Sequence, residues 1–206
     1  CAKATSCTSA STSDAVVLEA FLISTGVVAL AEIGDKTQLL ALLIAAKYRK
    51  PLPIILGILV ATLLNHALAG FVGAWIAAGL GPTALRWILG LSFIAMAAWM
   101  LVPDKADDLE DKPPRFGVFV ATLVAFFLVE IGDKTQIATV ALAAKYASLA
   151  SVVLGTTFGM MLANVPAVLL GEVAARKLPM KLVHGVAAAI FLLLGLAVLL
   201  GVGSLG

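Results

Sequence analysis

The sequence EIGDKTQ occurs twice in the chain, at residues 32–38 and again at residues 130–136. Both copies lie within long apolar stretches. The carboxylates that recur are Glu32, Asp35, Glu130 and Asp133. A charged side chain at the centre of a membrane costs about 3 kcal/mol or more unless it is paired or faces a polar cavity, so such charges mark functional sites. The repeated stretch therefore indicates a functional site.

A purely structural role for the motif is an ion pair along one helix. Glu32 precedes Lys36 by four residues, which is the favourable order for a helical ion pair, and the second copy repeats this spacing. Such a pair gives Asp35 and its counterpart no role. It also does not explain why a costly arrangement should occur twice.

The composition is that of a membrane protein. At 206 residues, 62% hydrophobic and 13% charged, with a mean hydropathy of +1.09, the chain is too apolar for a soluble domain of its size. The net charge of +2 includes no basic block, so we expect the lipid bilayer and not a nucleic acid as partner. The cysteines, Cys1 and Cys7, precede the apolar runs, which argues against thiolate ligands for a metal.

Six apolar runs could each cross a membrane, which takes about 20 residues. They are residues 15–46, 51–79, 83–102, 115–146, 148–175 and 180–203. The first and fourth runs are too long for a straight crossing and contain the motif, so we expect each to be kinked or broken at Gly34 and Gly132. Broken membrane helices line cavities, where transporters place their sites. Residues 1–14, rich in serine and threonine, are expected to form a disordered tail.

The repeat extends beyond the motif. AAKY at residues 45–48 returns at residues 143–146, the same offset as between the motifs. The chain therefore divides into halves of three spans, at 15–102 and 115–206, joined by an acidic linker at 103–114. An odd number of spans inverts the second half in the membrane, as in many secondary transporters. The predicted fold is an all-α membrane protein with six transmembrane helices in two inverted three-helix repeats.

Basic residues in the connections predict the orientation. Nine gather on one side of the predicted topology: Lys47, Arg49, Lys50, Lys105, Lys112, Arg115, Arg176, Lys177 and Lys181. The other side has Lys3, Arg86 and Lys145. By the positive-inside rule the first side is cytoplasmic. Both termini are then non-cytoplasmic, and the acidic linker faces the cytoplasm.

The two motifs together predict a cation site. On a helix Glu32 and Asp35 would share a face, and the second copy would repeat this arrangement. Four carboxylates suit hard or intermediate divalent cations such as Ca²⁺ or Mn²⁺. With Lys36 and Lys134 nearby, two negative charges remain in excess, which one divalent cation or two protons would neutralise. We therefore expect the metal and protons to occupy the same carboxylates in turn.

Further polar residues could support this site. Gln38 and Gln136 could add carbonyl oxygens as ligands. The hydroxyls of Thr37 and Thr135 could bind the cation or a backbone carbonyl one turn back. In the second and fifth runs the candidates are Asn65, His66 and Asn164. The asparagines could be ligands or bridges between helices, and the histidine could serve proton transfer, cation access or packing.

The doubled E-x-G-D-[KR]-[TS] signature, in two halves of three spans, resembles a family of cation/proton exchangers. Its members occur in bacteria, in thylakoid and chloroplast-envelope membranes, and in the Golgi. The resemblance implies transport of Mn²⁺ and Ca²⁺ against protons, with Glu32, Asp35, Glu130 and Asp133 as the cation site and no cofactor. It is strongest to the bacterial Mn²⁺ exporters, which implies a bacterial inner membrane.

Two other functions are compatible with parts of the pattern. An exporter of small organic cations or amino acids could share the architecture, but it would want an aromatic pocket beside the charges, and few aromatic residues lie near the motifs. An intramembrane aspartyl protease also pairs two aspartates, in a G-x-G-D context. Here Glu32 and Glu130 replace the first glycine, and the adjacent lysines would keep both aspartates ionised when one must be protonated. We therefore predict a transporter and not an enzyme.

Overall fold

The computed structural model describes residues 5–99, 101, 117–170 and 180–201. Within these ranges all regular structure is α-helical. The helices are α1 (Thr5–Glu32), α2 (Lys36–Tyr48), α3 (Pro51–Gly79), α4 (Pro82–Trp99), α5 (Gly117–Glu130), α6 (Lys134–Lys145), α7 (Leu149–Leu170) and α9 (Met180–Leu200). The predicted acidic linker at 103–114 lies outside the described residues.

Several helices are long and apolar enough to cross a membrane. Four qualify by length and composition: Asp14–Glu32, Pro51–Gly79, Pro82–Trp99 and Leu149–Leu170. Gly117–Glu130 and Gly185–Leu200 are shorter apolar helices. Large apolar side chains point outward, with Trp75 72% exposed and Leu193 65% exposed. A soluble monomer rarely shows so much apolar surface, so the chain is an all-α, multi-pass membrane protein.

Two helix breaks occur where the motif stands. α1 ends at Glu32 and α2 begins at Lys36, while α5 ends at Glu130 and α6 begins at Lys134. The glycine in each break has a positive φ, 83° at Gly34 and 78° at Gly132, in the left-handed region that glycine adopts without a steric penalty. The predicted breaks at these two glycines are confirmed.

In the structure α1 starts at Thr5 and includes residues 5–14 of the expected tail. This stretch contains neither glycine nor proline. Extending a helix that the following apolar residues have already nucleated costs little, so nothing in the tail stops α1 from continuing back through it.

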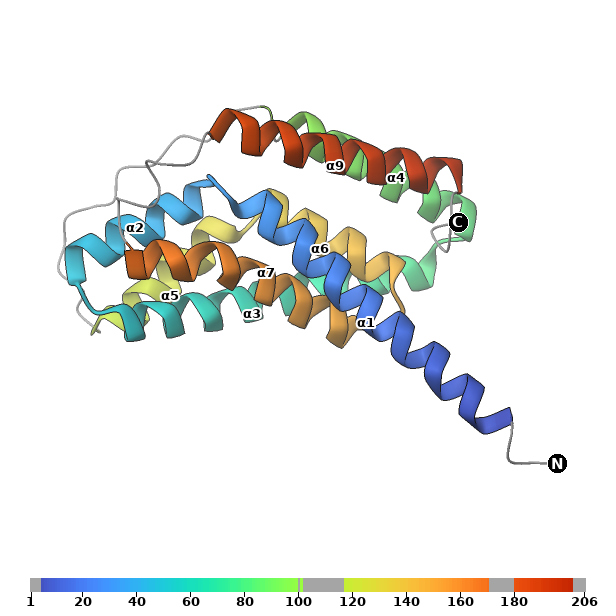
Figure 1. Cartoon of the computed structure of the whole chain (residues 1–206), viewed down its shortest axis with the longest axis horizontal. Helices are drawn as coiled ribbons and strands as arrows, with labels where there is room; N and C mark the ends of the chain where they lie inside the picture. The colour runs from blue at the N-terminus through green and yellow to red at the C-terminus, as the bar shows by residue number, and fades with distance from the viewer. Residues whose placement is uncertain (1–4, 100, 102–116, 171–179, 202–206) are drawn as a thin grey trace.

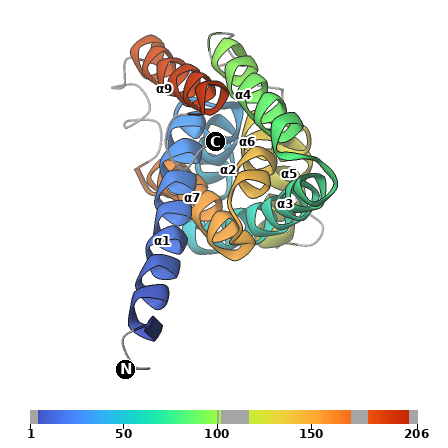
Figure 2. The same cartoon turned by 90° about the vertical axis from the view of Figure 1, so that its right-hand side faces the viewer.

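The helices form an elongated bundle (Figure 1). α1 packs most extensively on α7, and α3 packs on both α5 and α6. α4 and α9 lie side by side along one flank, where α4 contacts α6 and α9 contacts α1 (Figures 1 and 2). α2 and α5 lie at the end of the bundle away from the N-terminus (Figure 1). Both helix breaks therefore lie inside the bundle.

Equivalent glycines bring equivalent helices together. A side-chain carbon at Gly155 of α7 would lie 2.5 Å from the carbonyl oxygen of Phe21 in α1. One at Gly57 of α3 would lie 2.9 Å from the carbonyl oxygen of Phe119 in α5. Both residues of the first pair are related to those of the second by the offset that separates the motifs. The α7–α1 and α3–α5 interfaces thus have the same register, which brings both breaks to equivalent places.

Candidate cation site

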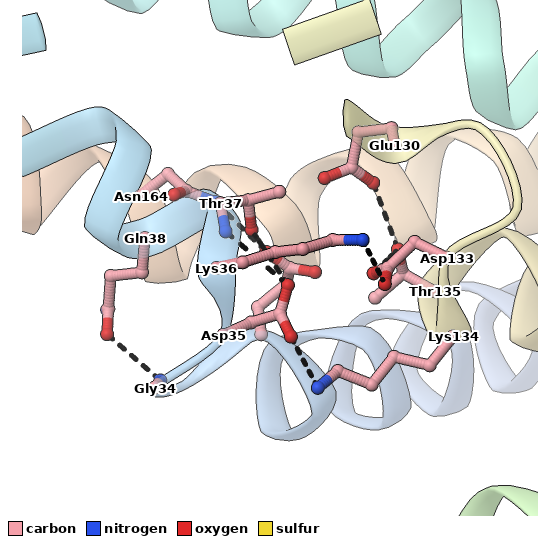
Figure 3. Close-up of polar contacts among 11 residues, drawn as sticks. Gly34, Asp35, Lys36, Thr37, Gln38, Glu130, Asp133, Lys134, Thr135 and Asn164 are labelled. Carbon is pink, nitrogen blue, oxygen red and sulfur yellow. Dashed lines mark hydrogen bonds and ion pairs between the residues drawn. The ribbon is translucent and has the colours of Figure 1, made fainter. Parts of the chain in front are cut away.

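Each break is a capped turn. Asp35 and Asp133 have extended backbone conformations and stand at the N-caps of α2 and α6. The Gln38 side-chain oxygen accepts a hydrogen bond from the Gly34 N–H at 3.0 Å, and Gln136 accepts one from Gly132 at 2.8 Å. Both glutamine oxygens are therefore bonded to the backbone of the turns and are not ligands beside the carboxylates in this state. Gln38 points away from the other motif (Figure 3).

Three carboxylates from both motifs converge at the centre. Glu32, Asp35 and Asp133 offer oxygens that all lie within 4.8 Å of one another. All three side chains are buried. They come from the end of α1 and from the turns that open α2 and α6. Glu130, also buried, lies outside this three-oxygen group on the far side of the Lys36 side chain (Figure 3).

The lysines pair across the two motifs. Lys36 Nζ lies 3.2 Å from an Asp133 carboxylate oxygen, and Lys134 Nζ forms an ion pair with Asp35 (Figure 3). The break turns each lysine away from the glutamate of its own motif. The sequence predicts that Glu32 and Asp35 share one face of a continuous helix. In the structure the helix is interrupted between them, and their carboxylates meet because the chain turns there. The Lys36 side chain is 28% exposed and that of Lys134 only 2%.

The threonines hold the glutamates. Thr37 Oγ1 donates to a Glu32 carboxylate oxygen at 2.5 Å, and Thr135 Oγ1 donates to Glu130 at 3.0 Å. From the sequence we expect these hydroxyls to bind the cation or a backbone carbonyl one turn back, and not to bond to the glutamates. The observed contact requires a turn between the glutamate and the threonine, and the glycine in the motif is the signal that could have revealed it.

The polar residues of α3 and α7 occupy different positions. Asn164 Nδ2 donates to Glu32 at 3.3 Å and to the Met160 carbonyl at 3.1 Å, so Asn164 belongs to the site. Asn65 Nδ2 donates to the Phe127 carbonyl at 3.1 Å and bridges α3 to α5. His66 is fully buried, and within the described part of the chain neither of its ring nitrogens has a hydrogen-bond partner.

The site is rich in negative charge, and its carboxylates are shielded from solvent. Its four carboxylates are buried against two lysines. One oxygen each of Glu32 and Glu130 has no hydrogen-bond partner among the described residues. Burying carboxylates without full compensation is costly, so protons or a cation must neutralise the excess. Carboxylate oxygens at this spacing can close around a divalent cation.

Comparisons with known proteins give the family. The chain matches the family described as divalent cation/proton antiporter GDT1 over residues 20–108 and 118–204. A protein of Vibrio cholerae named "Putative manganese exporter" is 56% identical over 88% of this chain and 90% of its own length. The GDT1-like protein sll0615 of Synechocystis is 27% identical over 86% of this chain and 95% of its own length.

More distant similarity extends to plants. The chloroplastic PAM71-homolog of Arabidopsis thaliana is 27% identical over 91% of this chain and 61% of its own length. No solved structure matches the chain. The family match covers both halves with both motifs, and the family is one of transporters and not of enzymes. This chain belongs to the family of divalent cation/proton antiporters.

Proposed function

We propose that the protein exports Mn²⁺, and Ca²⁺ as a second substrate, from the cytoplasm in exchange for protons. The observation that carries this proposal is the group of three buried carboxylate oxygens, drawn from both motifs, within 4.8 Å of one another. The name of the Vibrio cholerae relative supports Mn²⁺ as the main substrate. An exporter of organic cations finds no support in the family match.

The proposed architecture is six spans in two inverted repeats. In this arrangement α1 with α2, and α5 with α6, each form one broken span, and α3, α4, α7 and α9 are the others. The equal register of the Gly155–Phe21 and Gly57–Phe119 contacts supports the repeat. We call the end of the bundle where α2 ends the α2 end. The basic residues that follow α2 support a cytoplasmic location for this end and non-cytoplasmic termini, in a bacterial inner membrane.

Transport begins with the displacement of Lys36. This lysine is the more exposed of the two, and its nitrogen lies between the carboxylates of Glu130 and Asp133 (Figure 3). A divalent cation that enters from the cytoplasm takes the place of the ammonium group, while the buried Lys134 stays on Asp35. The four carboxylates then close around the cation, with Asn164 and Thr37 orienting Glu32.

Protons return on the same carboxylates. Once the cation has left to the other side, the excess negative charge in the buried site is neutralised by protons instead. A site that holds either a cation or protons, and that opens to each side in turn, couples the two flows without a separate proton pathway. The apparent affinity for Mn²⁺ must then weaken as the pH falls.

The test is transport by the purified protein in liposomes that contain a pH-sensitive dye. Entry of Mn²⁺ should raise the internal pH, and an imposed pH gradient should drive Mn²⁺ uphill, with Ca²⁺, Mg²⁺ and labelled lysine compared in parallel. Asp35→Asn and Asp133→Asn should each abolish exchange, because each removes one of the three carboxylates that converge at the centre of the site. Metal movement that ignores the pH gradient would contradict the proposal.

A further inference from the structure

His66 is a buried polar side chain that the mechanism so far does not use. It lies on the buried face of α3 and is 0% exposed. Neither Nδ1 nor Nε2 has a hydrogen-bond partner among the described residues. A neutral imidazole has one donor and one acceptor nitrogen, and buried polar groups are almost always paired, so a ring without a partner among the described residues is available to a ligand.

The repeat indicates what the ring faces. His66 and Asn164 are separated by the same offset as the two motifs. The α7–α1 and α3–α5 interfaces share one register, as the Gly155–Phe21 and Gly57–Phe119 contacts show. Asn164 Nδ2 lies 3.3 Å from a Glu32 carboxylate oxygen. By the same offset His66 corresponds to Asn164, and Glu130 corresponds to Glu32.

Independent contacts agree with this placement. Asn65, next to His66 in the chain, donates to the carbonyl of Phe127, which stands one helical turn before Glu130. That bond fixes this level of α3 beside the end of α5. Glu130 also has a buried carboxylate oxygen without a partner in the described ranges. A carboxylate oxygen of Glu130 and the imidazole of His66, both without a partner among the described residues, thus belong to the same part of the α3–α5 interface.

We propose that His66 is a nitrogen ligand of the transported cation, acting with Glu130, and that it sets the preference for Mn²⁺ over Ca²⁺ and Mg²⁺. This inference rests on the proposed function. Ca²⁺ and Mg²⁺ take oxygen ligands, whereas a ring nitrogen binds first-row transition metals. The two halves therefore contribute unequally: Asn164 orients Glu32 in one half, and His66 binds the metal beside Glu130 in the other.

The position of Lys36 explains why Glu130 lies outside the three-oxygen group in this state. The end of the Lys36 side chain lies between Glu130 and Asp133 (Figure 3). When a divalent cation displaces this ammonium group, Glu130 can move toward the other carboxylates. His66 lies on the part of α3 that packs beside the end of α5, so it can bind the same cation. The resulting site has mixed oxygen and nitrogen ligands.

The experiment is pulsed electron paramagnetic resonance on the full-length protein loaded with Mn²⁺ in detergent. A coordinated imidazole gives nitrogen hyperfine modulation of the Mn²⁺ echo. We expect this modulation in the unaltered protein and in His184→Asn, the matched control at the chain's other histidine, and its loss in His66→Asn. Labelling all histidine with ¹⁵N should change the isotope pattern of the unaltered protein, which requires no variant to fold.

Binding measurements give the selectivity. In His66→Asn the Kd for Mn²⁺ should rise about tenfold or more, at least as much as the loss of an outer-shell partner costs a metal site. The Kd for Ca²⁺ should change little, since asparagine supplies an oxygen in its place. His184→Asn should bind both cations like the unaltered protein.

The outcomes separate this inference from the function on which it rests. If Mn²⁺ binds and exchanges for protons but its spectrum carries no histidine nitrogen, the role of His66 is wrong and the proposed function stands. If His66→Asn retains the modulation and the preference for Mn²⁺, the inference falls in the same way. If the unaltered protein does not bind Mn²⁺, both fall.

Discussion

Lys36 and Lys134 occupy the same position in the motif, but their side chains lie in different environments. Lys134 is almost completely buried against Asp35, whereas Lys36 reaches Asp133 from a partly exposed position. Removing one partner of a buried ion pair leaves a buried charge uncompensated, which costs about 3–5 kcal/mol, and the cost is smaller where solvent already reaches the partner that is removed, as it does at Lys36. The two lysines should therefore differ in what they do for the protein.

We expect Lys134→Met to lower stability more than Lys36→Met, because Lys134 is the more deeply buried of the two lysines. Lys36→Met should also bind Mn²⁺ more tightly than the unaltered protein, because the competing ammonium group is gone. Thermal unfolding monitored by size-exclusion chromatography measures the first effect, and calorimetric titration with Mn²⁺ the second. Equal destabilisation by the two variants, or weaker Mn²⁺ binding in Lys36→Met, would contradict the assignment of Lys36 as the displaceable cation.

The glycine of each turn can be tested in the same way. Gly132 has a φ of 78°, and a side-chain carbon there would meet nothing within 4 Å, so a substitution acts through the backbone alone. Gly132→Ala should cost about 1–2 kcal/mol, the penalty of a left-handed conformation for other residues. The control is Gly185→Ala in α9, which also meets no neighbour but should be neutral or stabilising, because alanine favours a helix. Similar unfolding temperatures for both variants would rule out a backbone role for Gly132.

The sequence predicts the breaks but not the partners formed across them. Gly34 within a long apolar run is a local signal, and it correctly predicts where the helix is interrupted. The rule that pairs residues four apart assumes a continuous helix. It therefore cannot anticipate that Lys36 reaches Asp133, or that Thr37 holds Glu32. Contacts between the two halves depend on the packing of the bundle, which no local pattern specifies.

At the scale of the helices, small residues set how closely the elements approach. The limits of α3 coincide with the apolar run at 51–79, and α7 and α9 begin within one residue of the runs predicted for them. α4 and α9 also meet through glycines, because a side-chain carbon at Gly195 would lie 2.8 Å from the Gly90 carbonyl oxygen. Nothing in the sequence pairs these two glycines with each other. The glycines of α3 and α7 give a clearer signal, since their spacing is a small-residue pattern typical of membrane helix contacts.

A test at this scale compares two glycines. A side-chain carbon at Gly155 would lie 2.5 Å from the Phe21 carbonyl oxygen, which is backbone and cannot rotate away. Gly155→Ala should therefore push α7 from α1 and cost about 1–3 kcal/mol, in the range for overpacking. At Gly26 of α1 nothing lies within 4 Å, and Gly26→Ala should be tolerated. If the unfolding temperature of Gly155→Ala matches that of Gly26→Ala, the close α7–α1 contact is not formed.

Across the whole molecule the two halves are not packed alike. α3 packs more extensively on α6 than its repeat counterpart α7 packs on α2. The end of α6 is also tied to α1, because the Tyr146 hydroxyl donates to Glu19 at 3.3 Å and accepts from Lys145 at 3.1 Å. The residue that corresponds to Glu19 in the second half is Gly117, which has no side chain to form such a contact. Among the described residues, the helices are therefore packed more tightly at the α6 end than at the α2 end.

This asymmetry makes the orientation in the membrane decisive for the direction of transport. The less tightly packed end carries Lys47, Arg49 and Lys50, so the positive-inside rule predicts that the site is reached from the cytoplasm in this state. Lys50 and Gly81 flank α3 at its two ends, and both are exposed. With Cys1 and Cys7 replaced by serine, Lys50→Cys should react with a membrane-impermeant thiol reagent only in inverted vesicles, and Gly81→Cys only in intact cells. The opposite pattern would place the α2 end outside, and the same site would then take up cations instead of exporting them.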